Sequence, residues 1–330
     1  MSHSKTQSRL VDLFMDQILT DLIAKNVKFV VAGNNKTYTH EMKSCNNHEE
    51  ADTLIMNCLR LAELDPSDNV HVYATDTDII CPLVSLFNEI PCNNVYVGTK
   101  RGEITNIKAL REILGELRSA ALIAFHCVTG CDTVGEFNGI IKEALAKLFL
   151  NEHFSSDVLF ALTDFQHGLS DKVLCELEKM VCWGYLKKRD TFSSLETLSQ
   201  TRVHLYKKEL VKSEKIPPTL GAFRQHCLRA LHQLRQYTTS LQDTVDIRDP
   251  EEYGWILIDD EFKPHTTENE VAPESLIQFV SCNCVKGFCI KKCKCKSNGE
   301  PCTDFCGCGD LCQNTDPRVH ISALNEYISE

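Results

Sequence analysis

The first 150 residues alternate between amphipathic helical patterns and short runs rich in β-branched residues. Apolar residues recur at helical spacing over 9–25, and the run that follows, KFVVA over 28–32, has the composition of a strand. Further helical patterns cover 50–63, 79–87, 107–117 and 122–125, and strand-like runs cover 69–75 and 94–98. This alternation predicts an α/β domain with a largely parallel sheet and helices on both faces.

The rest of the chain changes character three times. Residues 151–240 are mostly helical in pattern, with one interruption at Pro217 and Pro218, and predict a helical extension. Residues 241–280 are polar and contain prolines, as expected of a connector, with one short strand predicted over 254–258. A cysteine-dense module follows over 281–314, and residues 315–330 form a tail.

Composition and charge narrow the range of functions. Apolar residues make up 43% of the chain and charged residues 25%, which is ordinary for a globular protein. The net charge of −11 repels phosphate backbones, so any contact with nucleic acid must be local. The first residues lack the features of a signal peptide, and no apolar run is long enough to span a bilayer. We therefore expect an intracellular protein with reduced thiols and no membrane partner.

Half of the 18 cysteines fall in one short segment with regular spacing, C-x-C-x4-C-x3-C-x-C-x6-C-x3-C-x-C-x3-C. They are Cys282, Cys284, Cys289, Cys293, Cys295, Cys302, Cys306, Cys308 and Cys312. Few apolar residues lie between them, so hydrophobic burial cannot hold the segment together. Thiolate ligation of Zn²⁺ can, because a structural zinc site contributes on the order of 10–16 kcal/mol of apparent folding free energy.

The odd number of cysteines favours a metal cluster over separate sites. Three tetrahedral zinc ions need twelve bonds, which nine thiolates supply if three of them bridge. The alternative, a disulfide knot, is disfavoured by the odd count and by a reducing compartment. The segment resembles a tesmin-type CXC domain at all nine cysteines and at Asn314. That resemblance implies DNA binding and a nuclear location, although the family's Tyr is replaced by Lys292 and the module's charge leaves a structural or protein-binding role equally open.

Carboxylates gather at three junctions of the α/β region: in HEEAD over 48–52, in DTD over 76–78, and at Asp132 in TGCDT. Each has a simple structural explanation, since acids favour the first turn of a helix and aspartate favours turns. Together they flank successive βα elements, where open α/β sheets bind ligands. The candidate ligands are Glu50, Asp52, Asp76, Asp78 and Asp132.

Convergence of these five side chains would require cations. At ~5 Å and an effective dielectric constant of about 20, each pair of carboxylates repels by roughly 3 kcal/mol. Oxygen-only ligation selects Mg²⁺ or Mn²⁺, and two such ions ~3.5–4 Å apart activate water for phosphodiester hydrolysis. Residues two apart diverge on a regular helix, so either Glu50 lies at the N-cap or Glu49 forms the pair with Asp52.

These motifs resemble the flap-endonuclease branch of the PIN-like nucleases. The family's E-A-E-A step is met by EADT over 50–53, its D-x-D step by DTD over 76–78, and its G-x-D step by GCD over 130–132. The resemblance implies a PIN-like sheet and metal-dependent hydrolysis of structured or single-stranded DNA by the five carboxylates. The motifs together also resemble a group of uncharacterised, mobile-element-like animal proteins, of which this chain would be an N-terminally shortened member.

Two other functions remain open. The chain could be a catalytically inactive, zinc-dependent adaptor for DNA or chromatin, with the carboxylates serving as turn and cap residues. It could also be a remnant that folds poorly. His126 and Cys127, which precede the TGCDT turn, are interpreted as packing residues because no third group is placed for nucleophilic catalysis.

Overall fold

The computed structural model describes residues 3–25, 28–33, 35–39, 43–74, 76–98, 102–186, 195–207, 215–267, 282–284, 289, 293–299, 301–302, 306–308, 312 and 314. The chain forms two compact units, Met1–Glu268 and Asn269–Glu330, and each is described by itself. No helix among the described residues combines the length and the apolar character needed to cross a membrane.

A three-stranded antiparallel sheet follows the N-terminal helix α1 (His3–Ala24). The strands, in sheet order, are β1 (Val30–Gly33), β2 (Lys36–Thr39) and β3 (Lys43–Cys45). Helix α1 packs closely on β1, since a Cβ added at Gly33 would lie 2.9 Å from Sδ of Met15. The helix predicted over 9–25 and the strand over 28–32 are thus present. The sequence pattern did not predict the antiparallel partners of that strand.

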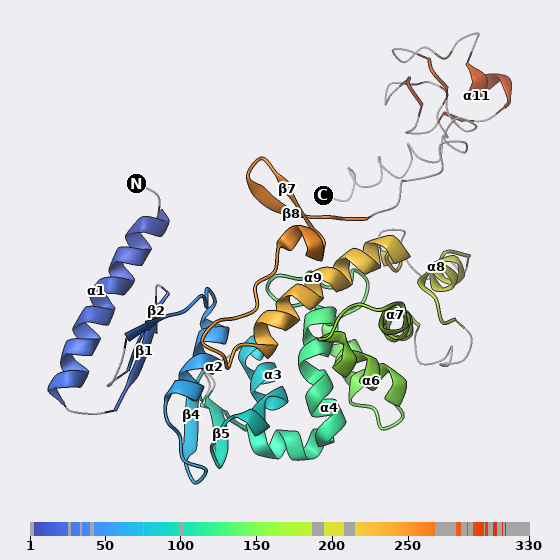
Figure 1. Ribbon diagram of the computed structural model, residues 1–330. Coiled ribbons are helices and arrows are strands. Elements are labelled where there is room, and N and C mark those ends of the chain that lie inside the picture. Colours follow the sequence, from blue (N-terminus) through green and yellow to red (C-terminus); the bar gives the residue numbers. More distant parts are fainter. Residues whose placement is uncertain are drawn as a thin grey trace. The chain divides into compact units, whose positions relative to one another are not determined.

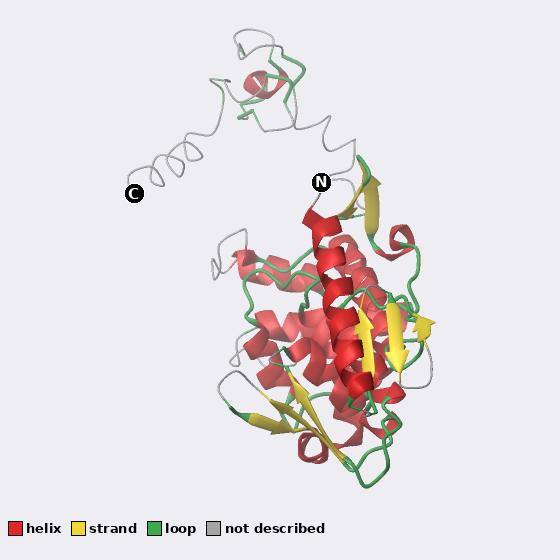
Figure 2. Cartoon of the chain, turned by 90° about the vertical axis from the view of Figure 1, so that its left-hand side faces the viewer, coloured by secondary structure: helices red, strands yellow, loops and turns green. Residues whose placement is uncertain are grey.

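A second small sheet contains the parallel pairing. Strand β4 runs parallel to β5, and β5 is antiparallel to β6. In chain order this part consists of α2 (Ala51–Leu61), β4 (Asn69–Tyr73), α3 (Thr77–Ser85), η1 (Phe87–Glu89), β5 (Asn94–Gly98) and β6 (Ile104–Asn106). The described residues are therefore mixed α/β, but their strands form small separate sheets with one parallel pair in place of the predicted parallel sheet (Figure 2).

Helix α4 (Ile107–Thr129) contacts α3, α6 and α9 (Figure 1). Its backbone breaks at Gly115 (φ 75°, ψ 166°), in the stretch where the sequence predicts two helical patterns. Phe125 of α4 stacks on Phe149, with ring centroids 4.4 Å apart, inside the larger apolar core. The other helices of this core region are α5 (Lys142–Phe149), α6 (Ser156–Phe165), α7 (Asp171–Tyr185), α8 (Leu198–Lys207) and α9 (Leu220–Thr238).

A β-hairpin ends the described part of the first unit. Its strands are β7 (Trp255–Ile258) and β8 (Glu261–Pro264), and the short helix η3 (Pro250–Tyr253) precedes them. The strand predicted over 254–258 is therefore present. Asp259 and Asp260 both have positive φ, as expected for a two-residue hairpin turn. Nη1 of Arg229 in α9 donates to the carbonyl oxygens of Gly254 and His265, at 2.8 and 2.9 Å. These bonds attach the hairpin to α9.

Candidate metal sites

Two of the carboxylate motifs lie at helix N-termini. Glu50 is the N-cap of α2, with extended backbone (φ −95°, ψ 145°), and its side chain makes no capping hydrogen bond. Asp52 lies in the first turn of the same helix. Because Glu50 precedes the helix, the divergence expected of residues two apart on a regular helix does not apply to this pair. The positive end of the helix dipole also favours both charges.

Asp76 and Asp78 have different surroundings. Asp76 is the N-cap of α3, where its Oδ1 accepts the backbone N–H of Asp78 at 3.1 Å, and it is exposed. Asp78 is 3% exposed, so it must find its partners within the protein.

Both oxygens of Asp78 have partners. Nε2 of His126 lies 2.9 Å from Oδ1, and the hydroxyl of Tyr237 donates to Oδ2 at 2.9 Å. Burial raises the pKa of Asp78, but His126, Tyr237 and a backbone hydrogen bond from Asp132 outweigh it and lower the pKa to about 2. Asp78 thus connects α3 to α4, to α9 and to the turn that carries Asp132. Each of its oxygens therefore already has a partner within the protein.

The imidazole of His126 lies between Asp78 and Lys142. Its Nδ1 is 3.0 Å from Nζ of Lys142, which also contacts the carbonyl oxygen of Gly130. Burial lowers the pKa of His126, but the contacts with Asp78 and Cys81 outweigh it and raise the pKa to about 10. Lys142 thus lies against the imidazole nitrogen that does not face Asp78.

Asp52 shows that the predicted carboxylates act on one another. Burial and, after it, the charges of Asp78, Asp76, Asp132 and Glu50 together raise its pKa to about 6. The three motifs therefore lie within electrostatic reach of one another. Glu50, Asp76 and Asp132 are exposed, so this carboxylate cluster is open to solvent. Among the described residues, however, groups of three or more ligand atoms within 4.8 Å of one another consist of cysteine sulfurs only. The carboxylate oxygens therefore lie farther apart than the ligand atoms of a formed metal site.

Helix α9 holds the TGCDT turn in place. Gln233 lies one helical turn before Tyr237, and its Oε1 accepts a hydrogen bond from the hydroxyl of Thr133 at 2.8 Å. Nε2 of His226 lies 2.7 Å from the carbonyl oxygen of Val128, and burial lowers the pKa of His226 to about 4, so its neutral ring donates this bond. Sequence reasoning missed Tyr237, Gln233 and His226, and it interpreted His126 as packing. Only the position of His126 beside the GCD motif could have indicated its role.

The loop after α9 holds the start of α2. The side-chain amide of Asn47 donates to the carbonyl oxygen of Val245 at 3.0 Å and accepts the backbone N–H of Val245 at 2.8 Å. Nε2 of His48 lies 3.0 Å from the carbonyl oxygen of Gln242. Residues almost two hundred positions apart thus fix the segment that carries Glu50.

The second unit contains the sulfur cluster. Of the nine cysteines predicted as ligands, eight are buried and Cys284 is half-buried. Three groups of four sulfurs each lie within 4.8 Å, and Cys282 belongs to all three. The groups are Cys282, Cys289, Cys302 and Cys308; Cys282, Cys293, Cys295 and Cys302; and Cys282, Cys284, Cys289 and Cys293. Cys306 and Cys312 lie outside these groups, but 3.7 Å from Cys295 and 3.4 Å from Cys289, respectively.

Because Cys282 belongs to all three groups, the sulfurs form one connected cluster and not separate four-cysteine sites. The closest sulfur–sulfur distances are 3.4 to 4.0 Å, far longer than a disulfide bond, and none of these nine cysteines is part of a disulfide. Backbone N–H groups of Lys296 and Cys282 donate to the sulfurs of Cys293 and Cys306, at 3.4 Å each. Such bonds stabilise thiolates, and clustered thiolates suit zinc-type metals.

Asn314, which the CXC resemblance includes, contacts the sulfur cluster directly. Its side-chain amide donates to the sulfur of Cys302 and its backbone N–H to the sulfur of Cys312, both at 3.3 Å. Cys293 caps the short helix α11 (Lys294–Ser297).

No family model, no curated protein and no solved structure matches this chain.

Proposed function

We propose that the protein is a metal-dependent nuclease that hydrolyses phosphodiester bonds of structured or single-stranded DNA. The observation that carries this proposal is that the exposed carboxylates of Glu50, Asp76 and Asp132 lie within electrostatic reach of Asp52, whose pKa is raised by burial and by the surrounding charges. Negative charge that accumulates at an open surface is stabilised by divalent cations. Glu50, Asp52, Asp76 and Asp132 are the ligands in this proposal.

The residues divide into two roles. Carboxylate oxygens select Mg²⁺ or Mn²⁺, which would activate water and stabilise the leaving oxygen of the phosphodiester. Asp78, held by His126 and Tyr237, positions Asp76 through the N–H···O bond at the start of α3. It also accepts the backbone N–H of Asp132. Movement of Asp78 would therefore displace two of the proposed ligands.

The sulfur cluster supports a separate task in the same protein. We assign it about three zinc ions, with the nine cysteines as ligands and three sulfurs as bridges. It would then serve as the module that contacts DNA, for which the exposed Lys294 and Lys296 offer local positive charge on a chain of net charge −11.

A second candidate is a catalytically inactive adaptor that binds DNA or chromatin through the sulfur cluster. It is favoured by the contrast between the two sites. The sulfurs form groups within 4.8 Å, whereas both oxygens of Asp78 are already occupied and no such group of carboxylates occurs among the described residues.

A cleavage assay separates the two candidates. The full-length, zinc-loaded protein is incubated with branched and single-stranded DNA in Mg²⁺ or Mn²⁺. The nuclease proposal predicts cleavage that Asp52→Asn and Asp132→Asn abolish. Asp157→Asn, which changes an exposed aspartate in the first turn of α6, serves as the matched control and should leave cleavage unchanged. Wild-type cleavage no greater than that of Asp52→Asn would reject the nuclease.

The adaptor makes a different prediction in the same preparation. If the protein binds DNA without cleaving it, and Cys282→Ser weakens that binding at least tenfold while Asp52→Asn does not, the adaptor is supported. DNA binding that is unaffected by Cys282→Ser would reject the sulfur cluster as the contact.

A further inference from the structure

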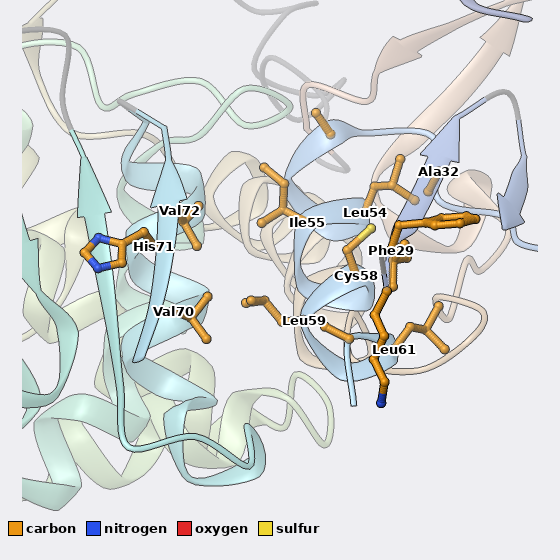
Figure 3. A pocket seen from close by; sticks show the side chains of 14 residues that line it. Phe29, Ala32, Leu54, Ile55, Cys58, Leu59, Leu61, Val70, His71 and Val72 are labelled. Carbon is orange, nitrogen blue, oxygen red and sulfur yellow. The ribbon is translucent and has the colours of Figure 1, made fainter. Parts of the chain in front are cut away.

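An apolar groove lies on the opposite side of α2 from the loop that follows α9, between β1 and β4. Its volume is about 490 Å³. Figure 3 shows Val70 and Val72 of β4 on one side, Phe29 and Ala32 on the other, and α2 between them. Helix α2 contributes Leu54, Ile55, Cys58 and Leu59 to the lining. Lys28 and His71 are the ionisable members of the lining apart from the thiol.

Among the described residues, each of the two strands that border this groove pairs with another strand on one side only. Strand β4 pairs with β5 on one side, and β1 pairs with β2 on one side. Within the part of the chain that the structure describes, no backbone hydrogen bond joins the other edge of β4 or of β1 to another strand. A free edge presents a row of N–H and C=O groups that can pair with a further strand.

The features that usually protect such an edge are absent from β4. Its sequence, NVHVY over 69–73, contains no proline and no charged residue, and its pairing with β5 is regular along all five residues. Val70 and Val72 point toward the groove side, while the ring of His71 stacks on Tyr96 of β5, with centroids 5.1 Å apart. An added strand would therefore meet hydrogen-bonding groups at the edge of β4 and apolar side chains from α2 beneath it.

We propose that this groove binds an extended segment of a partner polypeptide, which adds as a strand to the free edge of β4. The segment would carry apolar side chains at alternate positions, because side chains of a strand point alternately to its two faces and one face would lie on α2. A strand of about five or six residues matches β4. The inference does not depend on the proposed nuclease activity, since neither the groove nor β4 contains a proposed metal ligand.

Peptide binding to the full-length protein tests this inference. The probe is a library of fluorescent peptides, about six residues long, with Val, Ile, Leu or Phe at alternate positions and capped ends. Each peptide that binds is then compared with a methylated form of the same peptide. In this form, the alternate backbone nitrogens that would pair with β4 carry a methyl group. Strand addition predicts binders whose affinity falls on the order of tenfold or more on methylation. It also predicts slower deuterium exchange of β4 amides in the complex.

A variant of the protein provides a second test. Cys58→Trp fills the groove from α2 and should abolish peptide binding, whereas Cys175→Trp, at an exposed position on α7, should not. The comparison of methylated peptides uses the wild-type chain, so it does not depend on the folding of either variant.

Three results would overturn the inference. The library could contain no peptide that binds, methylation could leave the affinity unchanged, or peptide binding could slow deuterium exchange at amides outside β4 and not at those of β4. A dimer of the unliganded chain that Cys58→Trp dissociates would assign the groove to a second copy, and would overturn it too.

Discussion

Nε2 of His126 lies 2.9 Å from Oδ1 of Asp78, and the two side chains are 2% and 5% exposed. This ion pair joins the end of α4 to the start of α3, directly beside the carboxylate cluster. A buried charge pair of this kind leaves an uncompensated charge when one partner is removed. We therefore assign a structural role to Asp78, whereas we propose that the neighbouring carboxylates bind metal.

Asp78→Ala should destabilise the fold far more than Asp76→Ala. Removal of Asp78 leaves His126 and the hydroxyl of Tyr237 without their partner, at a cost of about 3–5 kcal/mol. Removal of Asp76 deletes one N-cap contact and costs about 1 kcal/mol. Urea unfolding of both variants measures the difference, and equal costs would show that Asp78 has no special structural role.

Tyr237→Phe tests the same network from α9. The substitution removes only the hydroxyl that donates to Asp78, so the loss is that of a hydrogen bond to a charged group, about 1.5–3 kcal/mol. Because this network lowers the pKa of Asp78 to about 2, its stabilisation is complete above pH 4 and declines as the pH falls toward 2. The difference in unfolding free energy between wild type and variant should shrink over that range. A difference independent of pH would contradict the assignment.

Asp52→Asn should stabilise the metal-free protein at neutral pH. The pKa of Asp52 is about 6 in the folded chain against an ordinary value of 3.8, so between these values the folded chain keeps a proton that the unfolded chain has lost. Stability therefore falls as the pH rises through this window, and an amide removes that loss. In EDTA the variant should melt at a higher temperature than wild type at pH 7.5, with little advantage at pH 4. Asp157→Asn controls for loss of charge in a first helical turn. A variant that melts lower than wild type at pH 7.5 would contradict the repulsion.

Zinc content should respond differently to two neighbouring cysteines. Cys282 belongs to all three sulfur groups and Cys284 to one, and Cys284 is the less buried of the two. Elemental analysis of the wild-type chain should give about three zinc ions. Cys282→Ser should lose more zinc than Cys284→Ser. Equal losses, or a wild-type chain without zinc, would contradict a shared cluster.

The elements with a strong periodic pattern could be predicted from sequence, and the weak ones could not. Helices α1 and α2 and strands β4 and β5 follow from their apolar spacing. Strand β3 has only three residues (KSC) and β2 is polar (KTYT), so they are strands only because each has a partner. The order of the elements predicted a largely parallel sheet. The described strands form small separate sheets, because strand pairing depends on tertiary contacts that the order of elements does not determine.

The same distinction applies to the carboxylate cluster. Its acids could be found because each lies at a turn or a helix start in a recognisable motif. Tyr237 could not be found, since it lies 159 residues from Asp78 in an apolar helical pattern where an aromatic residue indicates core packing. Its function in the structure depends on the docking of α9 against α4, which is a property of the tertiary fold.

Binding of Mn²⁺ to the zinc-loaded, full-length protein, followed by the loss of the free-ion signal in electron paramagnetic resonance, tests the central claim most directly. The proposal predicts saturable binding that Asp52→Asn and Asp132→Asn weaken at least tenfold, that Mg²⁺ competes away, and that Asp157→Asn leaves unchanged. Binding that is absent from the wild-type chain, or equal in all three variants, would contradict a metal site formed by Glu50, Asp52, Asp76 and Asp132.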